Sequence, residues 1–104
     1  MIVVGALAGC APDLCGRPAP CPNDTPPTQA DRDQCRATLQ ANSTSACYNE
    51  MLSYANCAAE NNVCGGDGHT DSALTATRVN NNCSNQLGTA VACCTRNPAA
   101  SACH

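Results

Sequence analysis

Apolar and cysteine side chains recur at helical spacing in two stretches of the chain. The first set, stepping by four, three and four residues, is Cys47, Met51, Tyr54 and Ala58. The second set, stepping by four, four, three and four, is Val79, Cys83, Leu87, Ala90 and Cys94. Such spacing places the residues of each set on one face of an α-helix. We expect helices over about 46–62 and from about 82 to Arg96 or Asn97, since Pro98 cannot continue the second one.

Capping and turn residues predict the remaining segments. Thr28 is suited to begin an earlier helix, with Asp31 and Asp33 near its positive end. The polar run 42–45 predicts a turn and a fresh N-cap, and Gly65–Gly66 predicts a helix stop. From Ser72 onward the chain is compatible with a weaker helix, because threonine and asparagine are poor helix formers. No stretch alternates in the manner of a strand, so we expect no sheet.

The segment 11–27 has a different character from the rest of the chain. Six of the seven prolines lie in it, and proline is unsuited to the interior of a helix or a sheet. We expect a semi-rigid, extended tether. Its two cysteines could close a small loop as a Cys15–Cys21 disulfide, or they could attach the tether to the body.

Composition leaves little material for an apolar core. No Phe, Trp or Ile follows Cys10, and alanine and cysteine make up most of the 43% hydrophobic content. Burial of one aliphatic side chain yields about 1.5–3 kcal/mol, and ordering a residue costs roughly as much. Small domains in this position use disulfides as staples, and eleven cysteines in 104 residues indicate an oxidising compartment.

The cysteine spacing predicts how the two main helices pair. Cys47 and Cys57 are ten residues apart, as are Cys83 and Cys93. Antiparallel helices with equal spacing match at both ends, which predicts the disulfides Cys47–Cys93 and Cys57–Cys83. Cys94 could replace Cys93, because one residue is a 100° turn of the helix. A third pair, Cys35–Cys103, is nearly in register and forms if the first helix continues the second.

This twin C-x9-C pattern resembles the coiled-coil–helix–coiled-coil–helix proteins, over the segments 47–57 and 83–93 only. The resemblance implies two helices stapled as an antiparallel hairpin. The connection between the helices is longer here and the other cysteines have no counterpart, so we carry over the geometry and not that family's location or role.

The stretch Leu7-Ala8-Gly9-Cys10 resembles a bacterial lipobox, and the chain is similar to small cysteine-rich lipoproteins of Gram-negative bacteria. Residues 1–9 read as the end of a signal peptide, although an ordinary buried apolar segment has the same composition. No Lys or Arg precedes the run, so we expect the true start to lie upstream. The resemblance implies a lipid on Cys10 and, with Ala11 in the next position, the outer membrane or cell surface. Setting Cys10 aside leaves ten cysteines, an even number.

Other chemistry has weak support in the sequence. A net charge of −3, with five Arg and no Lys, argues against nucleic-acid binding. No C-x-x-C motif is present for zinc or for thiol exchange, and no G-x-S-x-G for hydrolysis. Two sets could bind a metal: one is Cys83, Cys93, Cys94 and His104, and the other is Asp67, His69 and Asp71. Oxidation of the thiols and an ordinary solvated turn are the favoured explanations of these sets, so we expect no catalytic residue, metal or cofactor.

Together these features predict a small all-α, disulfide-rich protein. The signal segment 1–9 precedes a lipid-anchored tether 10–27, followed by a stapled helical domain 28–104 built as an antiparallel hairpin of two to three helices. We expect a non-enzymatic binding or structural role at the cell envelope, with the membrane as partner through Cys10. The alternative is a freely secreted, extracellular effector or inhibitor.

Overall fold

The computed structural model describes residues 14–104. The expected signal segment 1–9, the expected lipidation site Cys10 and the following Ala11 lie outside the described residues. The elements are η1 (Leu14–Gly16), α2 (Gln29–Asn42), α3 (Tyr48–Glu60), α4 (Ser72–Asn82), α5 (Ser84–Arg96) and η2 (Ser101–Cys103), where η marks a short 3₁₀ turn. Over this range there is no strand, only an isolated bridge between Cys64 and Thr70. The expected all-α, disulfide-rich fold class is confirmed.

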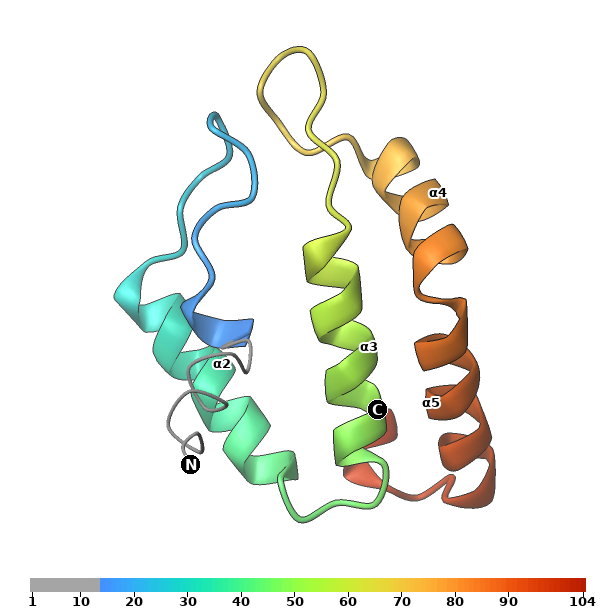
Figure 1. Ribbon diagram of the computed structural model, residues 1–104. Coiled ribbons are helices and arrows are strands. Elements are labelled where there is room, and N and C mark those ends of the chain that lie inside the picture. Colours follow the sequence, from blue (N-terminus) through green and yellow to red (C-terminus); the bar gives the residue numbers. More distant parts are fainter. Residues whose placement is uncertain (1–13) are drawn as a thin grey trace, which may run out of the picture.

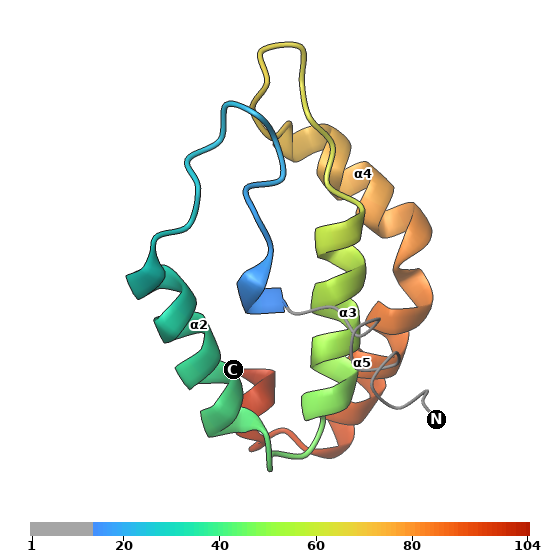
Figure 2. The same cartoon turned by 60° about the vertical axis from the view of Figure 1, so that its left-hand side comes forward.

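Helix α3 lies at the centre of the molecule (Figure 1). On one side, α4 and α5 follow each other almost end to end and return antiparallel to α3. On the other side lies α2, which reaches α3 through the turn at 43–47. The turn η1 lies between α2 and α3 (Figure 2), and η2 packs against α3. The predicted hairpin therefore consists of α3 and a broken arm made of two helices.

Two disulfides join α3 to this arm, and both are the pairs that the spacing predicts. Cys47–Cys93 has a Cα–Cα distance of 5.7 Å and Cys57–Cys83 one of 5.9 Å. Cys83 is the single residue between α4 and α5. The equal spacing of the cysteines thus translates into two bonds along one helix interface, which fixes the register of the hairpin.

The other two expected pairs are wrong. Cys35 pairs with Cys15, and Cys103 pairs with Cys94, so neither Cys35–Cys103 nor Cys15–Cys21 forms. The first fails because the turn at 43–47 reverses α2 alongside α3, whereas the predicted pair needs one continuous helix. In addition, the chain turns back after Pro98, which returns Cys103 to the end of α5.

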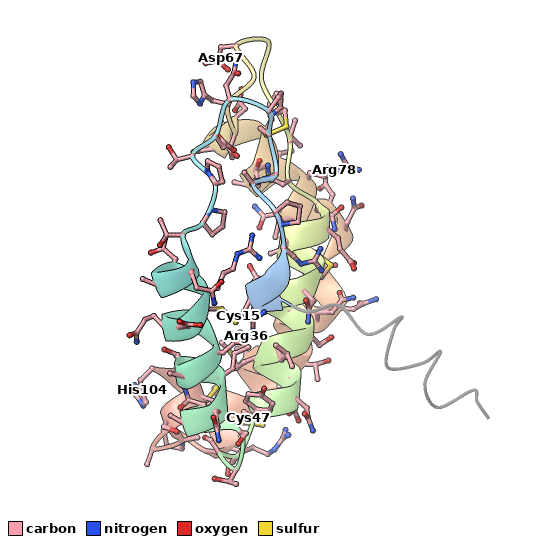
Figure 3. All side chains as sticks on the ribbon, turned by 90° about the vertical axis from the view of Figure 1, so that its left-hand side faces the viewer. Cys15, Arg36, Cys47, Asp67, Arg78 and His104 are labelled. Carbon is pink, nitrogen blue, oxygen red and sulfur yellow. A yellow bond between two sulfur atoms is a disulfide. The ribbon has the colours of Figure 1, made fainter. Side chains whose placement is uncertain are left out.

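Cys21 pairs with Cys64, in the loop after α3. The segment after η1 runs toward the end of the bundle where Asp67 lies, whereas Cys15 stays between α2 and α3 (Figure 3). Arg17 strengthens this attachment through an ion pair with Glu60 at 3.5 Å and a hydrogen bond to Asn56 at 3.2 Å. Residues 14–27 of the expected tether are therefore attached to the helical body, the second of the two alternatives for its cysteines.

Cysteine makes up most of the buried core. The buried hydrophobic residues of the described chain are Cys15, Cys21, Cys47, Val79, Cys83, Ala90 and Cys93. Larger side chains such as Leu74 and Val91 remain more than half exposed. Sulfur bridges thus occupy the positions that leucine or phenylalanine fills in an ordinary helical bundle.

The helices begin in three different ways. At α2, the Thr28 hydroxyl accepts from Asp31 N at 3.1 Å and the Asp31 carboxylate accepts from Thr28 N at 2.9 Å, a capping box on the predicted residue. At α4, Asp71 accepts from Leu74 N. At α3 the expected polar cap is wrong, because Cys47 is the N-cap, in the left-handed region with φ 71°.

Helix α3 is shorter than the predicted 46–62. It ends at Glu60, five residues before Gly65, and Asn61 follows as its C-cap. The Asn61 amide donates to the Cys57 carbonyl at 2.8 Å, which satisfies a carbonyl of the last turn. The asparagine therefore ends the helix, and Gly65–Gly66 lies in the following loop.

Replacing Thr28 by alanine tests the capping box. We expect Thr28→Ala to lower the free energy of unfolding by about 1 kcal/mol, because Asp31 N loses its acceptor. Thr38→Ala, an exposed position inside the same helix, is the matched control and should be neutral or slightly stabilising. Urea denaturation measures both variants; equal loss in the two would contradict the cap.

Removing disulfides tests which bond matters most. The Cys47–Cys93 bond spans 46 residues and Cys94–Cys103 spans nine. Each removal should cost about 2–4 kcal/mol, with the longer loop costing about 1.5 kcal/mol more through chain entropy. The comparison uses two double variants in urea, Cys47→Ala with Cys93→Ala and Cys94→Ala with Cys103→Ala. Equal or reversed losses would show that the long bond does not dominate.

Candidate functional site

Two loops meet at one end of the bundle and form what we call the loop junction, residues 21–24 with 64–71. The Cys21–Cys64 disulfide ties them together. Asn23 N donates to the Gly68 carbonyl at 2.8 Å, and the Asn23 amide donates to the Asp67 carbonyl at 2.7 Å. Gly68 has φ 79°, and a Cβ there would collide with the Asn23 side chain. The junction therefore requires glycine at 68.

Asp24 is the polar centre of the loop junction. Its carboxylate accepts from the Thr70 hydroxyl at 2.6 Å and from Thr70 N at 3.0 Å, and His69 Nδ1 lies 3.3 Å away. The Thr70 hydroxyl, followed by the Thr70 N–H and then His69, holds the pKa of Asp24 below its usual 3.8. The carboxylate thus orients the exposed His69 ring while it fastens one loop to the other.

The candidate metal ligands of this loop do not converge on a shared point. Asp67 accepts from His69 N at 3.0 Å, and Asp71 caps α4. His69 faces Asp24, a residue that the sequence motif does not contain. Each of the three side chains thus has a structural contact of its own. In residues 14–104, the one group of three or more potential ligands with mutually close atoms is made of cysteines.

That group, the sulfur cluster, consists of Cys47, Cys94 and Cys103, whose Sγ atoms all lie within 4.8 Å of one another. Its member Cys47 lies at the opposite end of the bundle from Asp67 (Figure 3). Two disulfides meet there, Cys47–Cys93 and Cys94–Cys103. The adjacent Cys93 and Cys94 therefore bond to different partners.

The cysteines of the other possible metal set are divided among three disulfides. Cys83, Cys93 and Cys94 bond to three different cysteines. The remaining member, His104, has its Nε2 2.8 Å from the Pro98 carbonyl. In the oxidised protein these residues therefore offer no thiolates to a metal.

Two small apolar grooves flank Met51. One, of about 230 Å³, is lined by Met51, Tyr54, Leu87, Ala90, Val91, Cys94 and Cys103. The other, of about 180 Å³, is lined by Leu14, Leu39, Asn42, Tyr48, Met51, Leu52, Ala55 and Ala102. The first is notable because the Cys94–Cys103 disulfide forms part of its wall. We call it the disulfide groove.

The sequence pattern misses several residues of these sites. Asp24 and Asn23 lie in the proline-rich segment, and the Cys21–Cys64 disulfide brings them to His69. That pairing is the one signal that would have indicated Asp24 as a partner of His69. Leu87, on a predicted helix face, is 38% exposed and borders the disulfide groove. The cluster of three sulfurs depends on the chain reversal after Pro98, which no spacing rule predicts.

Comparisons with protein-family models, curated proteins and solved structures find no match to this chain. No helix within residues 14–104 combines the length and the apolar character needed to cross a membrane.

Replacing Asp24 by asparagine tests the loop junction through its pH dependence. Because folding lowers the pKa of Asp24, the stability it contributes is present above the unfolded pKa and is lost as pH falls through the folded pKa. We expect the wild-type urea midpoint to fall more steeply below about pH 4 than that of Asp24→Asn, which should be less stable at pH 7.

Asp31 provides the internal reference for this experiment. Its pKa is also lowered, first by the Thr28 backbone N–H and then by the Thr28 hydroxyl, so both proteins keep some acid sensitivity. Asp33→Asn, a carboxylate outside the junction, is the matched control. Identical acid profiles for wild type and Asp24→Asn would show that Asp24 does not hold the loops together.

Proposed function

We propose that this chain is a lipid-anchored protein of the cell envelope, with the anchor on Cys10 and a non-enzymatic binding or structural role for the body. One observation carries the proposal. All ten cysteines of residues 14–104 pair with one another in five disulfides. Cys10, which ends the lipobox-like Leu7-Ala8-Gly9-Cys10, is thus the one cysteine of the sequence with no role in the disulfide framework.

The attachment of residues 14–27 changes how such an anchor would act. Cys15 is bonded to Cys35, so Leu14 beside it in η1 is held against the helical body, four residues after Cys10. Four extended residues span at most about 14 Å. A lipid on Cys10 would hold the body against the membrane surface, and a long flexible stalk is not part of the proposal.

A non-enzymatic role agrees with the polar groups at the loop junction. Asp24, which faces His69, is already bonded to Thr70 through both of its oxygens, and these bonds hold the loops in place. The grooves beside Met51 are small and apolar, and each has room for one apolar side chain of a binding partner. These features support recognition rather than acid–base chemistry.

Metabolic labelling tests the anchor. Residues 7–104 are expressed in a Gram-negative bacterium behind the charged start and apolar core of a signal peptide, and the cells are fed an alkyne fatty acid. We expect the label on the mature protein, a new N-terminus at Cys10, and partition into the detergent phase of Triton X-114. Cys10→Ser should abolish all three.

Cys103→Ser is the control, because it makes the same cysteine-to-serine change outside the lipobox and leaves Leu7-Ala8-Gly9-Cys10 unchanged. It should be acylated like the wild type. Release of unacylated wild-type protein into the medium would contradict the anchor and support the freely secreted alternative.

A further inference from the structure

We propose that the sulfur cluster is a thiol–disulfide exchange site, at which a small thiol opens Cys94–Cys103 and the released sulfur then displaces Cys93 from Cys47. The product is a second disulfide arrangement of the same chain. The site would take a low-molecular-weight thiol or dithiol as its reactant. This inference stands apart from the lipid anchor, since it rests on sulfur positions within residues 14–104.

The bond that opens first is the one with neither cysteine buried, because attack on the exposed Cys64 would have to release its buried partner Cys21 as a thiolate. Each of the other four disulfides contains at least one buried cysteine: Cys15, Cys21, Cys47 with Cys93, and Cys83. In Cys94–Cys103 neither residue is buried, and both line the disulfide groove. A small thiol in this groove reaches the Cys94–Cys103 bond without any opening of the helices.

Proximity selects the second bond. The Cys47 Sγ atom lies within 4.8 Å of both Cys94 and Cys103. Among residues 14–104, no other three cysteines are this close. Whichever of Cys94 and Cys103 is released as a thiolate therefore has a disulfide sulfur beside it, so the exchange is intramolecular and avoids the cost of a second encounter.

The steps balance in atoms and electrons. A thiolate RS⁻ attacks one sulfur of Cys94–Cys103, forming a mixed disulfide and releasing the other sulfur as a thiolate. That thiolate attacks Cys47, forming a new bond to Cys47 and expelling Cys93 as a thiolate, which takes a proton from solvent. A second RSH resolves the mixed disulfide. The sum is two RSH oxidised to RSSR, and two protein disulfides converted to one disulfide and two thiols.

Neighbouring groups assist the departure of Cys93. The Asn97 side-chain amide, held by the Cys93 carbonyl at 2.9 Å, lies 3.8 Å from Cys93 Sγ and 3.7 Å from Cys47 Sγ. It can donate to a thiolate on Cys93. Cys47 is held in the left-handed region at the start of α3, a conformation that a non-glycine residue keeps only while its surroundings enforce it. Exchange at Cys47 removes one of those constraints.

The C-terminal segment 97–104 is the part of the fold that the exchange changes. Cys94–Cys103 closes a loop of only nine residues, and without it the segment is held by contacts such as Ala102 N to the Ser45 hydroxyl at 3.1 Å. This segment also lines an open cleft of about 390 Å³ with the turn before α3. The exchange would thus loosen one end of the bundle and leave Cys57–Cys83 and the loop junction intact.

The variant Cys103→Ser isolates the second step. It leaves Cys94 as a thiol beside Cys47, so the protein should contain a mixture of Cys47–Cys93 and Cys47–Cys94. The sample is quenched in acid, alkylated with N-ethylmaleimide and digested with pepsin. We expect at least about a tenth of the label on Cys93, which means that the Cys47–Cys93 form exceeds the Cys47–Cys94 form by about tenfold or less. Cys35→Ser is the matched control: it frees Cys15, which has no third sulfur nearby, and should be labelled on Cys15 alone.

Limited reduction of the wild type keeps the test independent of how the variant folds. With less than one equivalent of dithiothreitol, the singly reduced protein should contain Cys47 bonded to Cys94 or Cys103, and a labelled Cys93. Label confined to Cys94 and Cys103, with Cys47–Cys93 intact, would overturn the exchange step. First reduction at any other disulfide would overturn the order of opening.

Discussion

The two disulfides between α3 and the α4–α5 arm are the constraint on which the rest of the structure depends. Few large apolar side chains are available, and within residues 14–104 five of the seven buried hydrophobic residues are cysteines. A hairpin of this composition buries too little surface to offset the entropy of folding by apolar contact alone. Covalent bonds at both ends of the interface remove unfolded-chain entropy instead. The helices then pack around sulfur.

The other parts of the molecule follow from this hairpin. Because Cys57–Cys83 fixes the direction of α4, the loop 61–71 emerges at one end of the bundle, where Cys64 bonds to Cys21 and the Asp24 network forms. Because Cys47–Cys93 fixes the other end, the reversed C-terminal segment brings Cys103 to Cys94 beside Cys47. The end with the loop junction is thus held by hydrogen bonds and the Cys21–Cys64 disulfide. The end with the sulfur cluster is held by two neighbouring disulfides, Cys47–Cys93 and Cys94–Cys103.

The parts of this fold that follow from local pattern could be predicted, and the parts that follow from chain reversals could not. Equal spacing of cysteines on two helical faces is enough to give Cys47–Cys93 and Cys57–Cys83. Thr28 and Asp31 define a helix start through contacts within four residues. In contrast, Cys15–Cys35 and Cys94–Cys103 depend on how the chain reverses over residues 17–28 and after Pro98. The contact between His69 and Asp24 depends in turn on Cys21–Cys64, so the loop junction could not be predicted from the sequence.

Disulfide mapping of the native protein tests the central claim most directly, that α3 is bonded to the returning arm at both of its ends. Thiols are blocked in acid, the chain is cut with pepsin, and the linked peptides are fragmented so that Cys93 and Cys94 are distinguished. We predict Cys47 joined to Cys93 and Cys57 joined to Cys83. A peptide in which Cys47 is joined to Cys57 would contradict the hairpin and everything that depends on it.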